Sequence, residues 1–138
     1  MPALRSFDYA VLRVVPRVER GEFLNAGVIL FCLELNYLDA RVAADENRLR
    51  LLWPDVDFQT VQLHLEAIAK VCRGDADAGP IAKLSQRERF HWLVSPRSTM
   101  IQVSPVHSGL CEKPEFEVEK LFNQFVRVSC AKEEEGKC

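Results

Sequence analysis

The sequence predicts an α+β domain in which an antiparallel sheet of about four strands carries helices packed on one side. Two observations lead to this prediction. The first third of the chain is rich in β-branched and aromatic residues, whereas helical periodicity begins near residue 45 and is interrupted by one strand-like segment at 98–104. With 138 residues, 48% of them apolar and 28% charged, the chain is long enough to form one core without metal or disulfide support.

Three strands are expected before residue 45. The segment 6–15 ends at Pro16, which has no N–H to donate to a neighbouring strand. The segment 23–35 contains a continuous apolar run, which indicates burial on both faces, and the segment 37–44 alternates in polarity. Because the connections are short, we expect these strands to form an antiparallel meander.

Capping and turn signals delimit the helices. Asp57 and Gly74 bracket an amphipathic segment, and Ser85 with Glu88 forms the S-x-x-E pattern of a capping box. Pro114 suits the first turn of the last helix. The four helices are expected at residues 45–53, 58–73, 86–93 and 114–126. The fourth strand, at 98–104, is expected to join the meander because its backbone groups need partners.

We expect a single domain over residues 1–130 and a disordered acidic tail over 131–138. The five cysteines are odd in number and form no C-x-x-C pair, so free thiols in a reducing cytosol are expected, with no metal and no cofactor. The longest apolar run is far shorter than the roughly 20 residues of a membrane span. The expected location is therefore cytoplasmic, away from membranes. The net charge of −2 disfavours nucleic acid as a partner.

One basic segment stands out within this weakly acidic chain. Residues 80–110 carry four Lys/Arg against one Asp/Glu and contain the stretch "SPRSTMIQVSPVHSG" at 95–109. Arg97 offers a planar fork of donors that suits phosphate or carboxylate, and His107 can donate or move a proton near neutral pH. The hydroxyls that would complete an anion site belong to Ser95, Ser98 and Thr99. The alternative is that these Ser-Pro steps are turn chemistry around a short strand.

A second charged stretch, residues 16–25, joins the first two strands. Arg17, Arg20 and Asn25 are candidate ligand-binding residues there, and Glu22 is a candidate general base or a partner that holds an arginine. Glu22 and His107 are the candidate catalytic residues. A Ser98–His107–Glu22 triad can be written, but the chain contains no G-x-S-x-G nucleophile elbow. The alternative is an ordinary solvent-exposed loop.

Two further residues raise questions of placement. Arg13 is a charge inside an otherwise apolar strand, so it either lies on the solvated face or is buried with a partner. His64 lies beside the apolar stripe of the 58–73 helix, and we interpret it as structural.

The segments "YAVLRVVPRVERGEFLNAGVILF" and "RFHWLVSPRSTMIQVSPVHSG" resemble the small bacterial proteins grouped as domain of unknown function 3037. The similarity covers roughly residues 6–126. The resemblance implies no established catalytic residues. It does imply a partner protein, because members of this family tend to be encoded beside proteins similar to HipA-type kinases.

Two hypotheses of function follow. The favoured one is a non-enzymatic accessory or regulatory domain that binds a partner protein, with a HipA-like kinase as the partner that the resemblance implies. The alternative is a domain that binds a phosphate-containing small molecule or nucleotide, or acts on one, through the basic segment 87–109. Whether the chain is an enzyme stays open, with the balance towards a binding protein.

Overall fold

The structure is a computed structural model that describes residues 3–96 and 99–127. The predicted tail at 131–138 lies outside the described residues. The strands are β1 (Arg5–Val14), β2 (Leu24–Cys32), β3 (Tyr37–Val42), β4 (Ile101–Val103) and β5 (His107–Cys111). The helices are α1 (Glu46–Leu52), α2 (Phe58–Arg73), α3 (Gln86–Leu93) and α4 (Pro114–Phe125), with short 3₁₀ turns η1 (Val18–Arg20), η2 (Ala76–Ala78) and η3 (Pro80–Lys83).

The sheet is antiparallel and has the strand order β3-β2-β1-β4, with β5 also paired to β1. The predicted meander of the first three strands is confirmed. The later strand is also confirmed, although β4 is shorter than the predicted 98–104. A fifth strand, β5, was not predicted. It pairs with the first half of β1, opposite Arg5–Tyr9, while β4 pairs with the second half.

Residues 104–106 separate β4 from β5 along the same edge of the sheet. Two residues of β1, between Tyr9 and Leu12, lie opposite three residues of this edge, 104–106. Pro105 cannot donate a backbone hydrogen bond there. The Ser104 hydroxyl instead accepts the Val11 N–H at 2.8 Å, so the ladder stays closed across the break.

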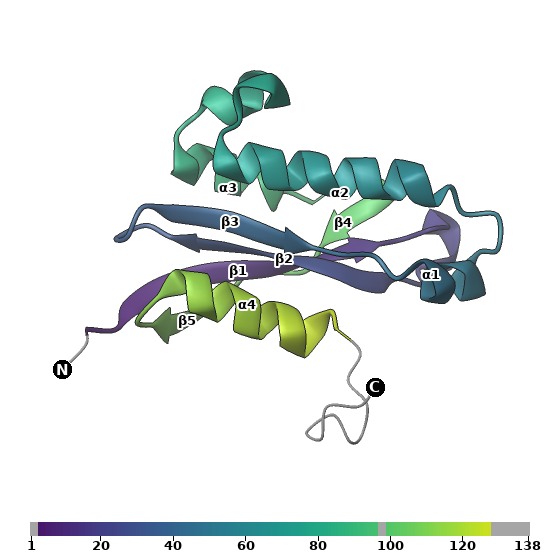
Figure 1. The fold of residues 1–138 in the computed structure, drawn as a ribbon, viewed down its shortest axis with the longest axis horizontal. Helices are drawn as coiled ribbons and strands as arrows, with labels where there is room; N and C mark the ends of the chain where they lie inside the picture. The colour runs from purple at the N-terminus through teal and green to yellow at the C-terminus, as the bar shows by residue number, and fades with distance from the viewer. Residues whose placement is uncertain (1–2, 97–98, 128–138) are drawn as a thin grey trace.

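Helices cover both faces of the sheet, which corrects the prediction of helices on one side. Figure 1 shows α2 and α3 on one face and α4 on the opposite face. The physical reason lies in β2. Its apolar run has side chains to bury on both faces of the sheet, as its sequence indicated. The β2 side chains in the core beneath α2 are Leu24, Ala26, Ile29 and Phe31, and those beneath α4 are Val28, Leu30 and Cys32.

The helix caps form as the sequence predicts. The Asp57 carboxylate accepts the Thr60 N–H at the start of α2, and Gly74 ends this helix with φ of 72°. Both halves of the Ser85–Glu88 capping box are present at the start of α3. These caps satisfy backbone N–H groups that a helix leaves unpaired, and they fix where α2 and α3 begin.

A β-bulge in β2 sets the direction of Asn25. Leu12 pairs with Gly27 but Arg13 pairs with Asn25, so Ala26 is an extra residue and the alternation of faces shifts by one. Gly27 is required there because a Cβ would lie 2.8 Å from the Arg41 carbonyl oxygen. As a result Asn25 lies on the α4 face, where its side-chain amide donates to the Phe125 carbonyl oxygen at 3.1 Å.

Candidate functional site

The charged loop between β1 and β2 forms its own ion pairs. An Arg17 guanidinium nitrogen lies 2.6 Å from the Glu19 carboxylate, and Arg20 Nε donates to Glu22 at 2.8 Å. All four side chains are exposed. The hydrogen bond from Arg20 lowers the pKa of Glu22, which makes that carboxylate a weaker base. Of the two roles predicted for Glu22, the geometry favours holding an arginine.

The hydroxyls flanking the basic stretch make local hydrogen bonds. Ser95 Oγ donates to the His91 carbonyl oxygen at 2.8 Å, and Thr99 Oγ1 donates to the Ile101 carbonyl oxygen at 2.8 Å. Arg97 and Ser98 lie outside the described residues, so an anion site centred on them stays a prediction. The Val15 N–H donates to the Met100 carbonyl oxygen at 2.7 Å, which places this stretch beside the start of the β1–β2 loop.

His107 lies far from Thr99. It is in β5 opposite Tyr9, and the two rings are 5.4 Å apart between centroids. Met100 bonds to Val15, six residues after Tyr9 and just past the end of β1, which corresponds to about 20 Å at strand spacing. Tyr9 packs against the core beneath α4, whereas Met100 packs against the core beneath α2. The described members of the predicted site therefore occupy separate places on opposite faces of the sheet.

Arg13 was expected either on the solvated face of the sheet or buried with a partner, and the structure places it between these two alternatives. Its side chain is half-buried, with the guanidinium carbon 4.3 Å from the centre of the Phe23 ring. Its Nε is buried without a hydrogen-bond partner, and no carboxylate pairs with it among residues 3–96 and 99–127. The Phe23 ring is therefore the partner that the structure gives to Arg13.

A largely apolar cavity lies between α2 and the chain leading into β4. This apolar groove has a volume of about 500 Å³ and is lined by α2, η2, α3 and residues 99–101. Its principal side chains are His64, Ala67, Ile68, Val71, Trp92 and Met100. Trp92 is 42% exposed, and Val71 is buried at the base. Its dimensions and lining fit the usual range for a binding pocket.

The groove exists because α2 has a second row of side chains beside its buried apolar stripe. Val61, Leu65 and Cys72 face the sheet and are almost wholly buried. His64, Ala67 and Val71 follow at three- and four-residue spacing and form the neighbouring stripe. His64 is exposed and lines the groove, and its interpretation as structural stays a prediction. Sequence periodicity showed the first stripe and gave no sign that the second would lie open.

A second, charged depression lies on the α4 side of the sheet. This arginine depression has a volume of about 580 Å³ and is bounded by β2, β3, α1 and α4. Arg41, Arg48 and Arg127 line it together with Asn25 and Glu119. Only Asn25 among these was predicted to bind a ligand. The others are spread over eighty residues of sequence and could not be grouped without the fold.

Two general features of the described residues bear on function. No helix within them is both long and apolar enough to span a membrane. No group of three or more histidine, cysteine, aspartate or glutamate side chains gathers there in a way that could hold a metal ion.

No curated protein and no solved structure matches the chain. A family model does match it, over residues 9–126, which include the four helices, β2 to β5 and the second half of β1. Its description is Protein of unknown function (DUF3037), the family that the two sequence segments resemble. Because the match covers most of the chain, the protein belongs to the DUF3037 family.

Proposed function

We propose that this chain is a non-enzymatic binding domain that holds an apolar segment of a partner protein in the apolar groove. The observation that carries the proposal is the groove itself, about 500 Å³ lined mainly by apolar side chains and open to solvent. Tryptophan and methionine, two residue types enriched at protein interfaces, are both part of its lining, as Trp92 and Met100.

The length of the groove suits a short peptide segment. From His64 to Val71 the α2 wall runs for seven residues, about 10 Å at 1.5 Å per residue. This length matches two turns of a helix or three residues of a strand. Leu63, 62% exposed and one turn before Ala67, extends the apolar surface beyond the groove. A partner that covers both would bury more apolar area than a small ligand could.

The sheet edges offer a poorer docking mode. On the β3 edge, the Ala40 N–H donates to the Asp39 carboxylate at 2.8 Å, so that donor is already satisfied. On the other edge, Pro105 interrupts the run from β4 to β5. Both features are devices by which proteins discourage strand addition. A partner is therefore expected to bind the helical layer.

The first partner to test is the HipA-like kinase that the family resemblance implies. We propose it as the source of the apolar segment, and we place the contact on the α2 face. Its binding would make this chain an accessory or regulatory subunit, with the chemistry belonging to the kinase-like protein.

The experiment compares two single-charge variants of the same helix. Ala67→Glu puts a carboxylate into the groove, whereas Gln62→Glu adds the same charge at an exposed position of α2 outside it. Each variant and the wild type are titrated with the purified kinase-like protein by calorimetry. We expect Gln62→Glu to bind like the wild type, and Ala67→Glu to bind at least about tenfold more weakly because an unpaired charge would be desolvated.

Two results would count against the proposal. Equal binding by Ala67→Glu and the wild type would show that the contact lies elsewhere on the chain. No measurable binding by the wild type would exclude the kinase-like protein as the partner. Circular dichroism of each variant checks that α2 is intact, since both substitutions are at exposed helix positions.

A further inference from the structure

The arginine depression points to a second binding activity, separate from the groove. It lies on the opposite face of the sheet, where the ends of β2 and β3 meet α1 and the last turn of α4. Asn25 fixes this corner, because its amide donates to the Phe125 carbonyl oxygen at the end of α4. That bond holds the backbone from which Arg127 extends.

The three arginines are held to different degrees. Arg41 is the most constrained, with Asp39 at 2.6 Å and Glu119 at 3.3 Å. Arg127 reaches Glu119 only at 3.9 Å. The Arg48 guanidinium makes no ion pair or hydrogen bond with any of the described residues. Arg48 and Arg127 are therefore available to a ligand. Arg41 pairs with the Glu119 carboxylate and fixes its position.

The backbone around Arg48 is fixed although its side chain is not paired. Asp45 accepts the Arg48 N–H at 3.2 Å as the N-cap of α1, which engages one oxygen of that carboxylate. The lining then has three guanidinium groups against the carboxylates of Asp45 and Glu119. Asp39 lies outside the lining and pairs with Arg41 as a third carboxylate, so the positive charge open to a ligand is that of Arg48 and Arg127.

The floor of the depression is apolar. Phe122 and Val126 line it and are 5% and 8% exposed. The Arg127 guanidinium carbon lies 5.2 Å from the centre of the Phe122 ring, which restricts its orientation before any ligand arrives. A ligand that fills the depression would contact charge at one end and hydrocarbon at the other.

We propose that the arginine depression binds a small phosphate monoester with a compact apolar body, through Arg48 and Arg127. A guanidinium fork matches phosphate oxygens in a bidentate manner. A phosphate group carries about 1.5 to 2 negative charges near neutral pH, so it competes with Glu119 for Arg127 better than a carboxylate does. A volume of about 580 Å³ accommodates a molecule of this size.

The test uses three probes of graded chemistry. Phenyl phosphate, inorganic phosphate and benzoate are titrated at constant ionic strength into the ¹⁵N-labelled full chain and followed by NMR. We expect saturable shifts of amides around Asp45 and Val126, with phenyl phosphate binding most tightly and benzoate most weakly. Benzoate binding as tightly as phenyl phosphate would overturn the assignment to phosphate, and no saturable binding would overturn the site.

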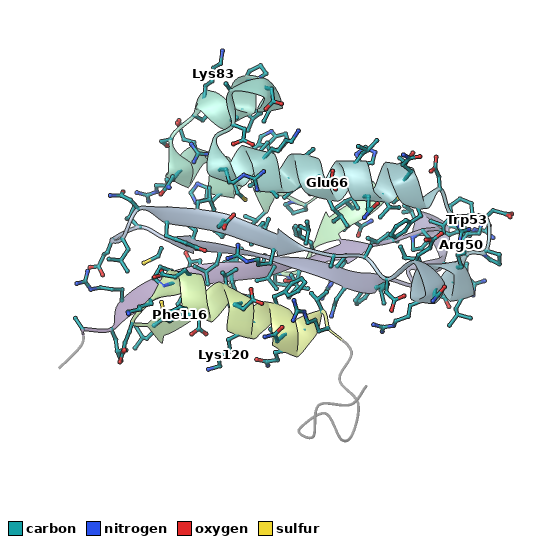
Figure 2. The ribbon with its side chains drawn as sticks, in the orientation of Figure 1. Arg50, Trp53, Glu66, Lys83, Phe116 and Lys120 are labelled. Carbon is teal, nitrogen blue, oxygen red and sulfur yellow. The ribbon has the colours of Figure 1, made fainter. Side chains whose placement is uncertain are left out.

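A matched pair of double variants separates this site from general electrostatics. Arg48→Gln/Arg127→Gln removes two positive charges from the depression, and Arg73→Gln/Lys83→Gln removes two exposed charges from the helical layer on the other face. Figure 2 shows Lys83 at the far side of the sheet from α4. We expect the first pair to weaken phenyl phosphate binding at least about tenfold and the second to leave it unchanged within about twofold. Equal weakening by both would overturn the proposal.

Discussion

Ser104 and Val11 are joined by two hydrogen bonds that replace a missing rung of the sheet. The Ser104 N–H donates to the Val11 carbonyl oxygen at 2.9 Å, and the Val11 N–H donates to Ser104 Oγ at 2.8 Å. The hydroxyl takes the place that a backbone carbonyl would fill in a regular ladder. It also donates to the Pro105 carbonyl oxygen at 2.9 Å, so its donor and acceptor functions are both used.

Replacement of Ser104 by alanine should therefore destabilise the fold. The Val11 N–H would be left buried without a partner, at a cost of about 1–3 kcal/mol in the free energy of unfolding. Ser108→Ala is the matched control, because the Ser108 hydroxyl bonds to Asp8 at 2.6 Å at an exposed position of the same edge. Urea denaturation should show a clear loss for the first variant and little change for the second. Equal losses would mean that the Ser104 bond has no special role.

Gly27 should tolerate no larger side chain. An alanine Cβ would lie 2.8 Å from the Arg41 carbonyl oxygen and 3.0 Å from a methyl group of Leu12, so β2 and β3 would have to move apart. Overpacking of this kind costs about 1–3 kcal/mol. Gly21→Asn is the control, since Gly21 has φ of 72° in open space and asparagine accepts that conformation. If urea denaturation gives both variants wild-type stability, the close contact at Gly27 is not limiting.

Arg13→Met should leave the stability of the protein unchanged or raise it. A half-buried guanidinium without a carboxylate partner gains little from its charge, and methionine keeps the contact with Phe23. The interaction with the ring is worth about 0.5–1 kcal/mol. A double-mutant cycle of Arg13→Met with Phe23→Leu measures it by urea denaturation. A loss well above 1 kcal/mol in the single Arg13 variant would show that its guanidinium has a stronger partner in solution.

Local signals in the sequence predicted most of the fold. Asp57, Ser85 and Pro114 mark helix starts through chemistry confined to one turn, so each could be read without the rest of the chain. The β5 strand was missed because Pro105 looks like the end of a strand, whereas the structure uses the Ser104 hydroxyl to continue pairing past it. That continuation depends on Val11, more than ninety residues earlier.

The face of the sheet on which α4 packs also depends on contacts between residues that are far apart in the sequence. Its apolar stripe predicted that it would be buried, but not on which face. The apolar run of β2 gave the relevant clue, since it needed cover on both faces and α2 could supply only one. The two cavities were beyond sequence reasoning for this reason: each is assembled from elements whose relative placement the periodicity does not specify.

Cys72 provides a pH-dependent test of the core beneath α2. Burial, with a smaller contribution from Asp39, raises the pKa of this thiol from 9.0 to about 12. Between pH 9 and 12 the unfolded chain loses the thiol proton while the folded chain keeps it, so the contribution to stability is complete below pH 9 and falls as the pH rises. The slope from this one group is at most about 1.4 kcal/mol per pH unit.

A comparison with Cys72→Ala isolates this contribution from other groups that titrate in the same range, Tyr37 among them. The variant should be somewhat less stable than the wild type at pH 8, because it leaves a small gap in the core. The difference should shrink or change sign by pH 11, because the variant has no thiol to keep protonated. Urea denaturation at both pH values measures this. A constant difference would show that the Cys72 thiol ionises as readily in the folded chain as in the unfolded one, and that water reaches the core beneath α2.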